Sequence, residues 1–179
     1  MYRSKAVRTP LGDATLASDG KSLTGLWLDN QKYHGGAILG DAVEKDGLTV
    51  FDAARDWLAR YFAGGRPTPD ELPLAPAGGE FRQGVWEILR RIPYGEVVTY
   101  GDIAKQMAAR TGAAKMSGQA VGGAVGHNPI SIVIPCHRVV GASGSLTGYG
   151  GGIWRKVKLL ELEGVDMAGL FVPAKGTAL

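Results

Sequence analysis

Four prolines fall within one short segment near the middle of the chain, between Arg66 and Glu80, at positions 67, 69, 73 and 76. Proline fixes φ and lacks the amide hydrogen that a helix interior or an inner strand needs, so this segment cannot continue a regular element. We interpret it as an extended linker between two subdomains. The chain of 179 residues is long enough for one compact domain or two small ones. We place the division between residues 1–79 and 80–179.

The part before the linker combines strands with one helix. Residues 30–48 are polar and glycine-rich and show no clear period. Apolar residues then recur at helical spacing between residues 50 and 62, which predicts a helix that the following glycine pair ends. Apolar and β-branched residues, with turn-forming residues between them, predict three short strands, at Tyr2–Val7, Gly12–Ala17 and Leu23–Leu28.

The part after the linker is mostly helical. An apolar stripe between residues 81 and 89 predicts a first helix. Thr99, three residues before Asp102, is a capping-box signature for a second helix that runs to about Met107. Ser117 caps a third, shorter helix, which Asn128 and the following proline stop. A glycine-containing connection joins these last two helices, so they form a candidate helix-turn-helix, with an ordinary helical hairpin as the open alternative.

The third helix is unusual because it contains four glycines, at positions 118, 122, 123 and 126, each of which weakens a helix. A helix surface without side chains allows the backbone to approach a ligand closely, or to pack closely against another helix. Both explanations are open. Further along the chain, Ile130–Ile134 predicts a buried strand, and a glycine-rich loop covers residues 141–152. A final helix carries Ile153, Val157 and Leu160 on one stripe and ends at Glu163–Gly164.

Charge is unevenly distributed. Residues 1–80 carry 9 Lys and Arg against 11 Asp and Glu, whereas residues 81–179 carry 11 against 6. The second part therefore has the charge to attract a polyanion, although a solvated basic surface explains the same numbers. No apolar stretch is long enough to cross a bilayer, and the first ten residues lack the apolar core of a signal peptide. We expect a cytoplasmic protein that does not bind membranes.

Cys136 is the only cysteine, which excludes an internal disulfide and a multi-cysteine zinc site. The three histidines are scattered, so we predict no metal site. A free thiol, with a pKa of ~8.5, is mostly protonated at neutral pH and needs a base to react. His137 adjoins it, but on an extended strand the two side chains would point to opposite faces, so contact needs a turn or a bridging water. Glu163 is a candidate to orient the imidazole, and an inert buried cysteine is the open alternative.

The segment Ile134–Val140, with the sequence Ile-Pro-Cys-His-Arg-Val-Val, resembles the active-site signature of the O6-alkylguanine-DNA alkyltransferases. The resemblance covers residues 80–165 and is weaker over residues 1–79. Its other parts occur in the family's order and spacing, at Phe81–Trp86, Ile92–Tyr100, Ala120–Gly122, Asn128–Pro129 and Gly148–Gly164.

The resemblance implies an α+β fold. A small N-terminal domain with an antiparallel, ribonuclease H-like sheet would precede a mostly helical C-terminal domain with a winged helix-turn-helix-like motif. The second helix of that motif would enter the minor groove of double-stranded DNA, and the alkylated nucleotide would be flipped out of the stack. The implied activity is a single irreversible transfer of the alkyl group from O6-alkylguanine, with O4-alkylthymine as a further candidate substrate. No cofactor is implied, and we expect a monomer.

Carried over by position, the resemblance implies a role for each catalytic side chain. Cys136 would accept the alkyl group, and His137 would take the thiol proton through a water. Glu163 would hold and polarise His137. The Tyr100 hydroxyl would donate to the guanine ring as negative charge develops there, and Asn128 would tie the second helix to the active-site segment. Each has a plainer alternative: a surface aromatic for Tyr100, a solvated helix end for Glu163 and a helix stop for Asn128.

Further residues are implied to contact DNA or the damaged base. The backbone carbonyls of Cys136 and Val139 would accept from the exocyclic amine of guanine. Tyr149 and the backbone of Gly150 would line the alkyl pocket and contact O6. We also assign Arg138 of the signature to DNA or substrate binding.

The chain departs from the family's pattern at two points. Gln119 stands where many members carry an arginine that fills the gap left by the flipped base, which predicts weaker or more salt-sensitive flipping. The cysteines with which some members bind zinc are missing, so that site should be absent.

Three other functions compete with repair. A non-repairing sensor would flip lesions without an acceptor thiol, which the presence of Cys136 argues against. A transcription regulator would need a second domain, and none is visible in 179 residues. A cysteine hydrolase would turn over repeatedly.

Overall fold

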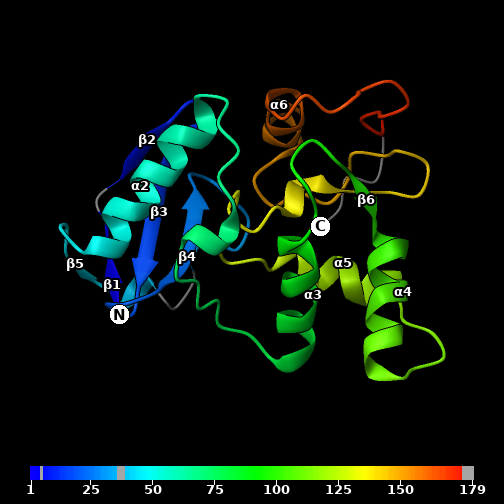
Figure 1. Ribbon diagram of the computed structural model, residues 1–179, viewed down its shortest axis with the longest axis horizontal. Helices are drawn as coiled ribbons and strands as arrows, with labels where there is room; N and C mark the ends of the chain where they lie inside the picture. Colours follow the sequence, from blue (N-terminus) through cyan, green and yellow to red (C-terminus); the bar gives the residue numbers. More distant parts are fainter. Residues whose placement is uncertain (5, 36–38, 175–179) are drawn as a thin grey trace. The chain divides into compact units, whose positions relative to one another are not determined.

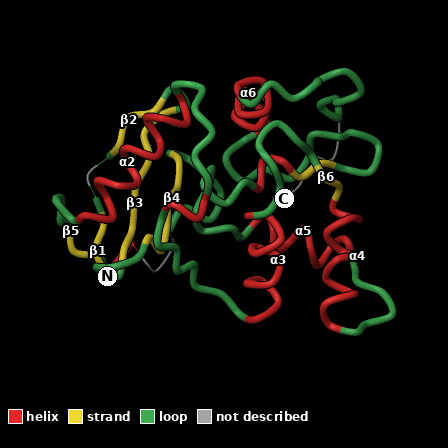
Figure 2. The backbone as a smooth tube through the Cα atoms, viewed as in Figure 1, coloured by secondary structure: helices red, strands yellow, loops and turns green. Residues whose placement is uncertain are grey.

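The computed structural model describes residues 1–4, 6–35 and 39–174. Contacts divide the chain into two compact units, one formed by Met1–Ala77 with Pro129–Val133 and the other by Gly78–Asn128 with Ile134–Leu179. The sheet belongs to the first unit, and most of the helices belong to the second (Figures 1 and 2). No helix in the described ranges is long and apolar enough to cross a membrane.

The first unit is built on a five-stranded sheet. Its central strand is β3, which pairs antiparallel with β1, β2 and β4. The sheet is mixed where the resemblance implied an antiparallel one, because β5 pairs with β1 in parallel. The strands are β1 (Tyr2–Arg3), β2 (Val7–Thr9), β3 (Gly12–Ser18), β4 (Leu23–Leu28) and β5 (Val43–Glu44).

The predicted first strand is in fact two short ones, and Ser4 explains where β1 ends. Its hydroxyl accepts a hydrogen bond from the Leu16 amide at 3.2 Å, while its own amide donates to the Leu16 carbonyl at 3.0 Å. A side-chain oxygen thus takes the place of a backbone carbonyl in the ladder. The other two predicted strands are confirmed within one residue at either end.

Helix α2 (Thr49–Phe62) contacts β2, β3 and β4 and confirms the predicted helix. Figure 1 shows it lying across one face of the sheet. The Trp57 indole donates to the Thr68 carbonyl at 2.9 Å, which fixes the start of the proline-rich segment. That segment is more ordered than a free linker: it forms the short 3₁₀ helix η1 (Pro69–Glu71), and Leu74 then bridges to Leu23 of β4.

The second unit contains three mutually contacting helices: α3 (Glu80–Arg90), α4 (Tyr100–Thr111) and α5 (Gly118–Gly126). Figures 1 and 2 show α5 between the other two. Trp86 of α3 is buried, and its indole donates to the Ala124 carbonyl of α5 at 2.9 Å. Further apolar residues of these helices complete the core: Val85, Leu89, Ile103, Met107, Val121 and Val125.

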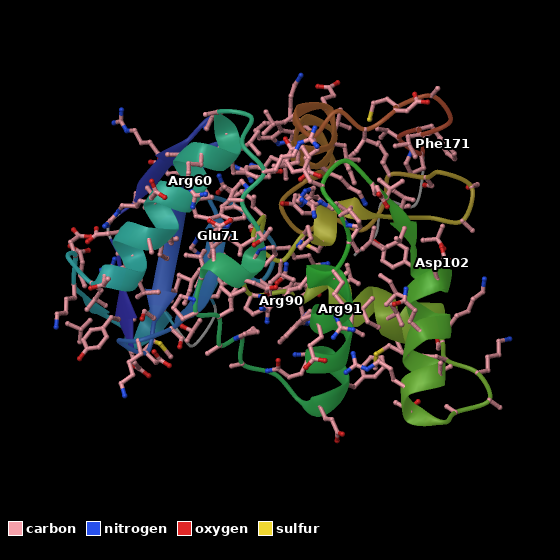
Figure 3. The ribbon with its side chains drawn as sticks, viewed as in Figure 1. Arg60, Glu71, Arg90, Arg91, Asp102 and Phe171 are labelled. Carbon is pink, nitrogen blue, oxygen red and sulfur yellow. The ribbon has the colours of Figure 1, made fainter. Side chains whose placement is uncertain are left out.

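The predicted helix starts in this unit are confirmed. The Thr99 side chain accepts from the Asp102 amide at 3.1 Å, and the Asp102 carboxylate accepts from the Thr99 amide at 3.2 Å, which completes the capping box of α4. Figure 3 labels Asp102 in the first turn of this helix. Ser117 caps α5 through the Ala120 amide at 3.4 Å. Helix α4 ends at Thr111, four residues beyond the predicted end.

The predicted strand at residues 130–134 is wrong. Only Ile130 makes a β-bridge, with Leu26 of β4, and residues 131–133 form a turn. Ile132 has a φ of 69°, in the left-handed region that β-branched residues rarely adopt. The apolar run correctly indicated burial, because all five residues are buried. Burial does not require an extended backbone, and here the run reverses direction.

The last helix, α6 (Ile153–Leu162), ends at Glu163 as predicted, and Gly164 follows with a φ of 72°. Its predicted stripe packs on a small apolar cluster around Val140, Leu146 and Val165. Before it, the two-residue strands β6 (Val98–Thr99) and β7 (Val139–Val140) pair in parallel, with Val98 beside Val139. This pairing joins the start of α4 to the segment that carries Cys136.

Candidate active site

A single 3₁₀ turn, η2 (Cys136–Arg138), carries the cysteine and the histidine. On the sequence alone, the two side chains could cooperate only through a turn or a bridging water, and the structure has a turn here. Pro135 precedes the turn, and the Arg138 amide closes it on the Pro135 carbonyl at 3.0 Å. All three residues of η2 are buried.

The sulfur of Cys136 lies among hydrogen-bond donors. The Asn128 side-chain amide donates to it at 3.1 Å and also to the Ile134 carbonyl at 2.8 Å. Burial raises the pKa of the Cys136 thiol, although donors from Asn128 and the backbone, together with the charge of Lys156, oppose that rise. The resting group is therefore a neutral thiol whose ionised form has partners already in place. Asn128 is thus more than a helix stop.

His137 is fully buried, and its Nε2 lies 2.7 Å from Oε1 of Glu163. Burial lowers the pKa of His137, and the Glu163 carboxylate opposes that effect. The second ring nitrogen, Nδ1, is buried and has no hydrogen-bond partner among the described residues. An ionised carboxylate only accepts hydrogen bonds, so the ring proton is on Nε2 and Nδ1 carries a lone pair.

Glu163 is buried and is not a solvated helix end. Arg138 donates to it twice, from Nε at 2.8 Å and from Nη2 at 2.9 Å. The Gly95 amide donates a further hydrogen bond at 3.2 Å. Burial alone would favour the neutral acid, but the hydrogen bonds and charges of His137 and Arg138 outweigh it and hold the pKa of Glu163 well below 4.5.

Gly95 can adopt this position because it is a glycine. Its φ is 81°, and a Cβ atom there would lie 2.9 Å from the Glu163 carbonyl oxygen. The contact of Gly95 with the end of the last helix was not predicted from the sequence.

Two tyrosines lie close enough to Cys136 for its charge to affect them. Burial raises the pKa of Tyr100 and of Tyr149, and the negative charge of Cys136 in its ionised form raises both further, so both hydroxyls keep their protons. The Tyr100 hydroxyl donates weakly to the carbonyls of Thr147 and Gly148, at 3.3 and 3.4 Å. It is half-buried at the start of α4 and so is not a fully exposed surface aromatic.

Tyr149 stands edge-on to the His137 ring, with a centroid distance of 6.4 Å. Its hydroxyl is buried without a hydrogen-bond partner in the described part of the chain. Gly150 follows it and is half-buried. A Cβ atom on Gly151 would lie 2.6 Å from the Tyr149 ring, so this glycine is needed for the ring's position.

Lys156 is a buried residue of the site that the sequence argument missed. Its Nζ donates to the Val139 carbonyl at 2.5 Å and to the Thr147 carbonyl at 2.7 Å. Burial lowers its pKa to about 8, against the opposing charge of Cys136. A lysine on an amphipathic helix ordinarily lies on the face exposed to solvent. The only sequence signal of its burial was its place one residue before the apolar Val157.

Gln119 lies in the first turn of α5, and its side chain is exposed. Cβ atoms built on Gly118 and Gly123 would meet no described atom within 4 Å, so close internal packing does not explain these glycines. Gly122 differs, because a Cβ there would touch the Tyr100 ring at 4.0 Å. An open, smooth helix surface therefore adjoins Tyr100.

The positive charge of the second half of the sequence is partly internal. Three of its eleven basic residues, Arg138, Arg155 and Lys156, are buried. The count of charges along the sequence therefore overstates the basic surface. Arg90 and Arg91, labelled in Figure 3 at the end of α3, are among those that reach the surface more fully.

Two family models match the chain. The model described as 6-O-methylguanine DNA methyltransferase, DNA binding domain, matches residues 80–165, and the one described as its ribonuclease-like domain matches residues 1–76. A methylated-DNA–protein-cysteine methyltransferase of Mycobacterium tuberculosis is 47% identical over 163 residues, which cover 91% of this chain and 93% of that protein.

The chain belongs to the 6-O-methylguanine DNA methyltransferase family. A methylated-DNA–protein-cysteine methyltransferase of Haemophilus influenzae is 40% identical over 87% of this chain and 82% of its own length. A crystal structure of M. tuberculosis OGT in complex with DNA matches with a TM-score of 0.78 and 44% identity, over 91% of this chain and 92% of that one. The methyltransferase from Pyrococcus kodakaraensis matches at 26% identity with a TM-score of 0.63. These matches support the α+β fold.

Proposed function

We propose that this chain repairs alkylated DNA by transferring the alkyl group of O6-alkylguanine to the sulfur of Cys136, once per molecule. The observation that carries this proposal is the arrangement on η2. The sulfur accepts from Asn128 at 3.1 Å, and the adjacent His137 is held by Glu163 at 2.7 Å, while its other nitrogen has no hydrogen-bond partner among the residues that the structure describes. Family membership supplies the substrate class, because the named relatives act on methylated DNA.

In this mechanism His137 activates the thiol. The proton leaves Cys136 and passes, through a bridging water, to Nδ1 of His137. The imidazolium that forms is stabilised by Glu163, which is already ionised. Asn128 and the nearby charge of Lys156 stabilise the sulfur anion for the short time in which it exists.

The sulfur then forms a bond to the alkyl carbon as the bond from that carbon to O6 breaks. The electron pair of the broken bond goes to the guanine ring. The Tyr100 hydroxyl donates a hydrogen bond to the negative charge that develops there. Its raised pKa keeps that hydroxyl protonated until this step. The Val139 carbonyl accepts a hydrogen bond from Lys156 with one lone pair and accepts one from the exocyclic amine of guanine with the other.

The product is a thioether on Cys136, which has no good leaving group in water. Cys136 is the only cysteine in the chain, so no second thiol of the protein can regenerate it. One molecule is therefore consumed for each lesion. Tyr149 and Gly150 would line the space that the alkyl group occupies before transfer.

The wild-type protein tests this function directly. We expect its intact mass to increase by one methyl group after incubation with duplex DNA that contains O6-methylguanine, and not with the same duplex containing guanine. Peptide mapping should place the methyl group on Cys136. Binding to the lesion without a change in mass would instead indicate a damage sensor, and repeated release of product would indicate a hydrolase.

Gln119 is proposed to enter the DNA stack where the flipped base leaves. It is exposed on the smooth surface of α5 and carries a donor and an acceptor, but no charge. We expect Gln119→Ala to weaken binding to lesion-containing duplex, and Gln119→Arg to strengthen it, as measured by fluorescence anisotropy. Exposed Gln106 of α4 offers a control for loss of a glutamine side chain. Unchanged binding by Gln119→Ala would refute the role.

A further inference from the structure

The carboxylate of Glu163 has two basic neighbours, His137 and Arg138. They differ in whether compensating its charge leaves His137 able to act as a base. Among the described residues, Glu163 is the only buried carboxylate. A buried carboxylate stays ionised only if a cation or several donors compensate it. His137 could supply that cation only by taking up a proton, and a protonated imidazole cannot accept another from the thiol.

Arg138 already supplies the positive charge. Its guanidinium is charged throughout the physiological range and meets both oxygens of Glu163, at 2.8 and 2.9 Å. The pair is neutral as a whole, so His137 need only donate the proton that Nε2 carries in the neutral ring. The charge of Arg138 also lowers the pKa of His137, as does that of Lys156.

We propose that Arg138 is a positioning residue for His137: by neutralising Glu163, it keeps the imidazole uncharged, with Nδ1 free for the thiol proton. This inference rests on the proposed function, in which His137 is the base. It replaces our assignment of Arg138 to DNA or substrate binding.

The surroundings of Arg138 support this inference. The residue is 7% exposed, and Nη1 donates to the Ile92 carbonyl at 2.5 Å. The guanidinium lies over the Tyr94 ring, 5.7 Å from its centroid. Its three nitrogens thus point to Glu163 and Ile92 within the protein, whereas a phosphate contact requires an accessible guanidinium.

The other groups that face His137 are known, so a change in its titration can be interpreted. Cys136 is its neighbour on η2, Lys156 approaches from α6, and Tyr149 stands edge-on from the following loop. Cys136 and Tyr149 are neutral near pH 6, and Lys156 is charged there. Near that pH, the charge of His137 therefore depends on the opposing effects of Glu163, which raises its pKa, and of Arg138, which lowers it.

An NMR titration of His137 in the protein alone, without DNA, tests the proposal. The chain has three histidines, so histidine-labelled protein gives a simple nitrogen NMR spectrum. We expect wild-type His137 to stay neutral, protonated on Nε2, to below pH 6.5. In Arg138→Gln the midpoint should rise by about one pH unit or more, and in Arg138→Lys by less, because lysine keeps the charge but loses the paired hydrogen bonds.

The rate of methyl transfer in a single turnover is the second measurement. In Arg138→Gln the acid limb of the rate should move to higher pH with the His137 midpoint, and the rate should approach that of the wild type above it. A merely structural role would lower the rate equally at every pH. Arg60→Met is the matched control, because it breaks an exposed Arg–Glu pair at 2.8 Å on α2 and η1 (Figure 3).

Several outcomes would overturn the proposal. One is an identical His137 midpoint in the wild type and both variants. Another is an unchanged midpoint with weaker binding to undamaged duplex, which would restore Arg138 as a DNA contact. If Arg138→Gln does not fold, Arg138→Lys decides by the same criteria. A wild-type protein that gains no methyl group would contradict the proposed function alone, because the titration is measured separately.

Discussion

The Cys136→Ala variant is expected to bind DNA containing O6-methylguanine and to gain no mass from it. Removing the sulfur deletes the only thiol in the chain, and alanine fits the site without a new polar group. The loss should be complete, because no other step in the proposed mechanism forms a bond to carbon. Intact-mass measurement detects transfer, and fluorescence anisotropy with the same duplex detects binding.

Two further variants make this result specific to the site. Cys136→Ser keeps an atom of similar shape whose proton is far harder to remove, and we expect no transfer within the lifetime of the assay. In Cys136→Ala combined with Ala59→Cys, an exposed thiol on α2 should fail to restore transfer, because it lacks the partners found on η2. A methyl group gained by the single variants would place the acceptor elsewhere.

Replacing His137 with asparagine is expected to slow methyl transfer by about 10²- to 10⁴-fold at pH 7, the usual contribution of a general base. The variant should still fold, because Arg138 continues to neutralise Glu163. It should also bind lesion-containing DNA normally. Rapid-quench kinetics with protein in excess measure the transfer step, and circular dichroism and anisotropy provide the controls for folding and binding.

The pH dependence should distinguish loss of a base from general damage. The wild-type rate should stay level near neutral pH and fall as the pH drops through the pKa of His137, which burial holds below 6.5, because only the neutral ring accepts a proton. In His137→Asn the rate should instead rise with pH, because the thiol, with a pKa above 9.0, must ionise into solvent. A wild-type rate in the variant at pH 7 would exclude His137 as the base.

Local sequence signals predicted local structure well. The capping box at Thr99 and the serine cap at Ser117 mark helix starts in the structure, because each depends on a hydrogen bond between residues only three apart. The glycine after Glu163 ends α6 for a similarly local reason. The signature around Cys136 indicated the family, which the comparisons with known proteins then confirmed.

The errors share a different cause. The run Ile130–Ile134 indicated burial and was interpreted as a strand, but which backbone conformation achieves that burial depends on β4, about one hundred residues earlier. The burial of two cations was also not predicted: Lys156 was not singled out, and Arg138 was assigned to DNA or substrate binding as part of the signature. Each is buried, since carbonyls or a carboxylate from distant parts of the chain satisfy their donors.

The sequence by itself determined the order of the main helices and of the two longest strands, several of their ends and the presence of one thiol beside one imidazole, because these follow from residues within a few positions of one another. Only the tertiary structure decided the charge states in the site. They depend on desolvation and on the meeting of Gly95, Arg138 and Glu163, which are separated by up to 68 residues along the chain. Whether an imidazole beside a thiol is free to take its proton is therefore a property of the folded protein.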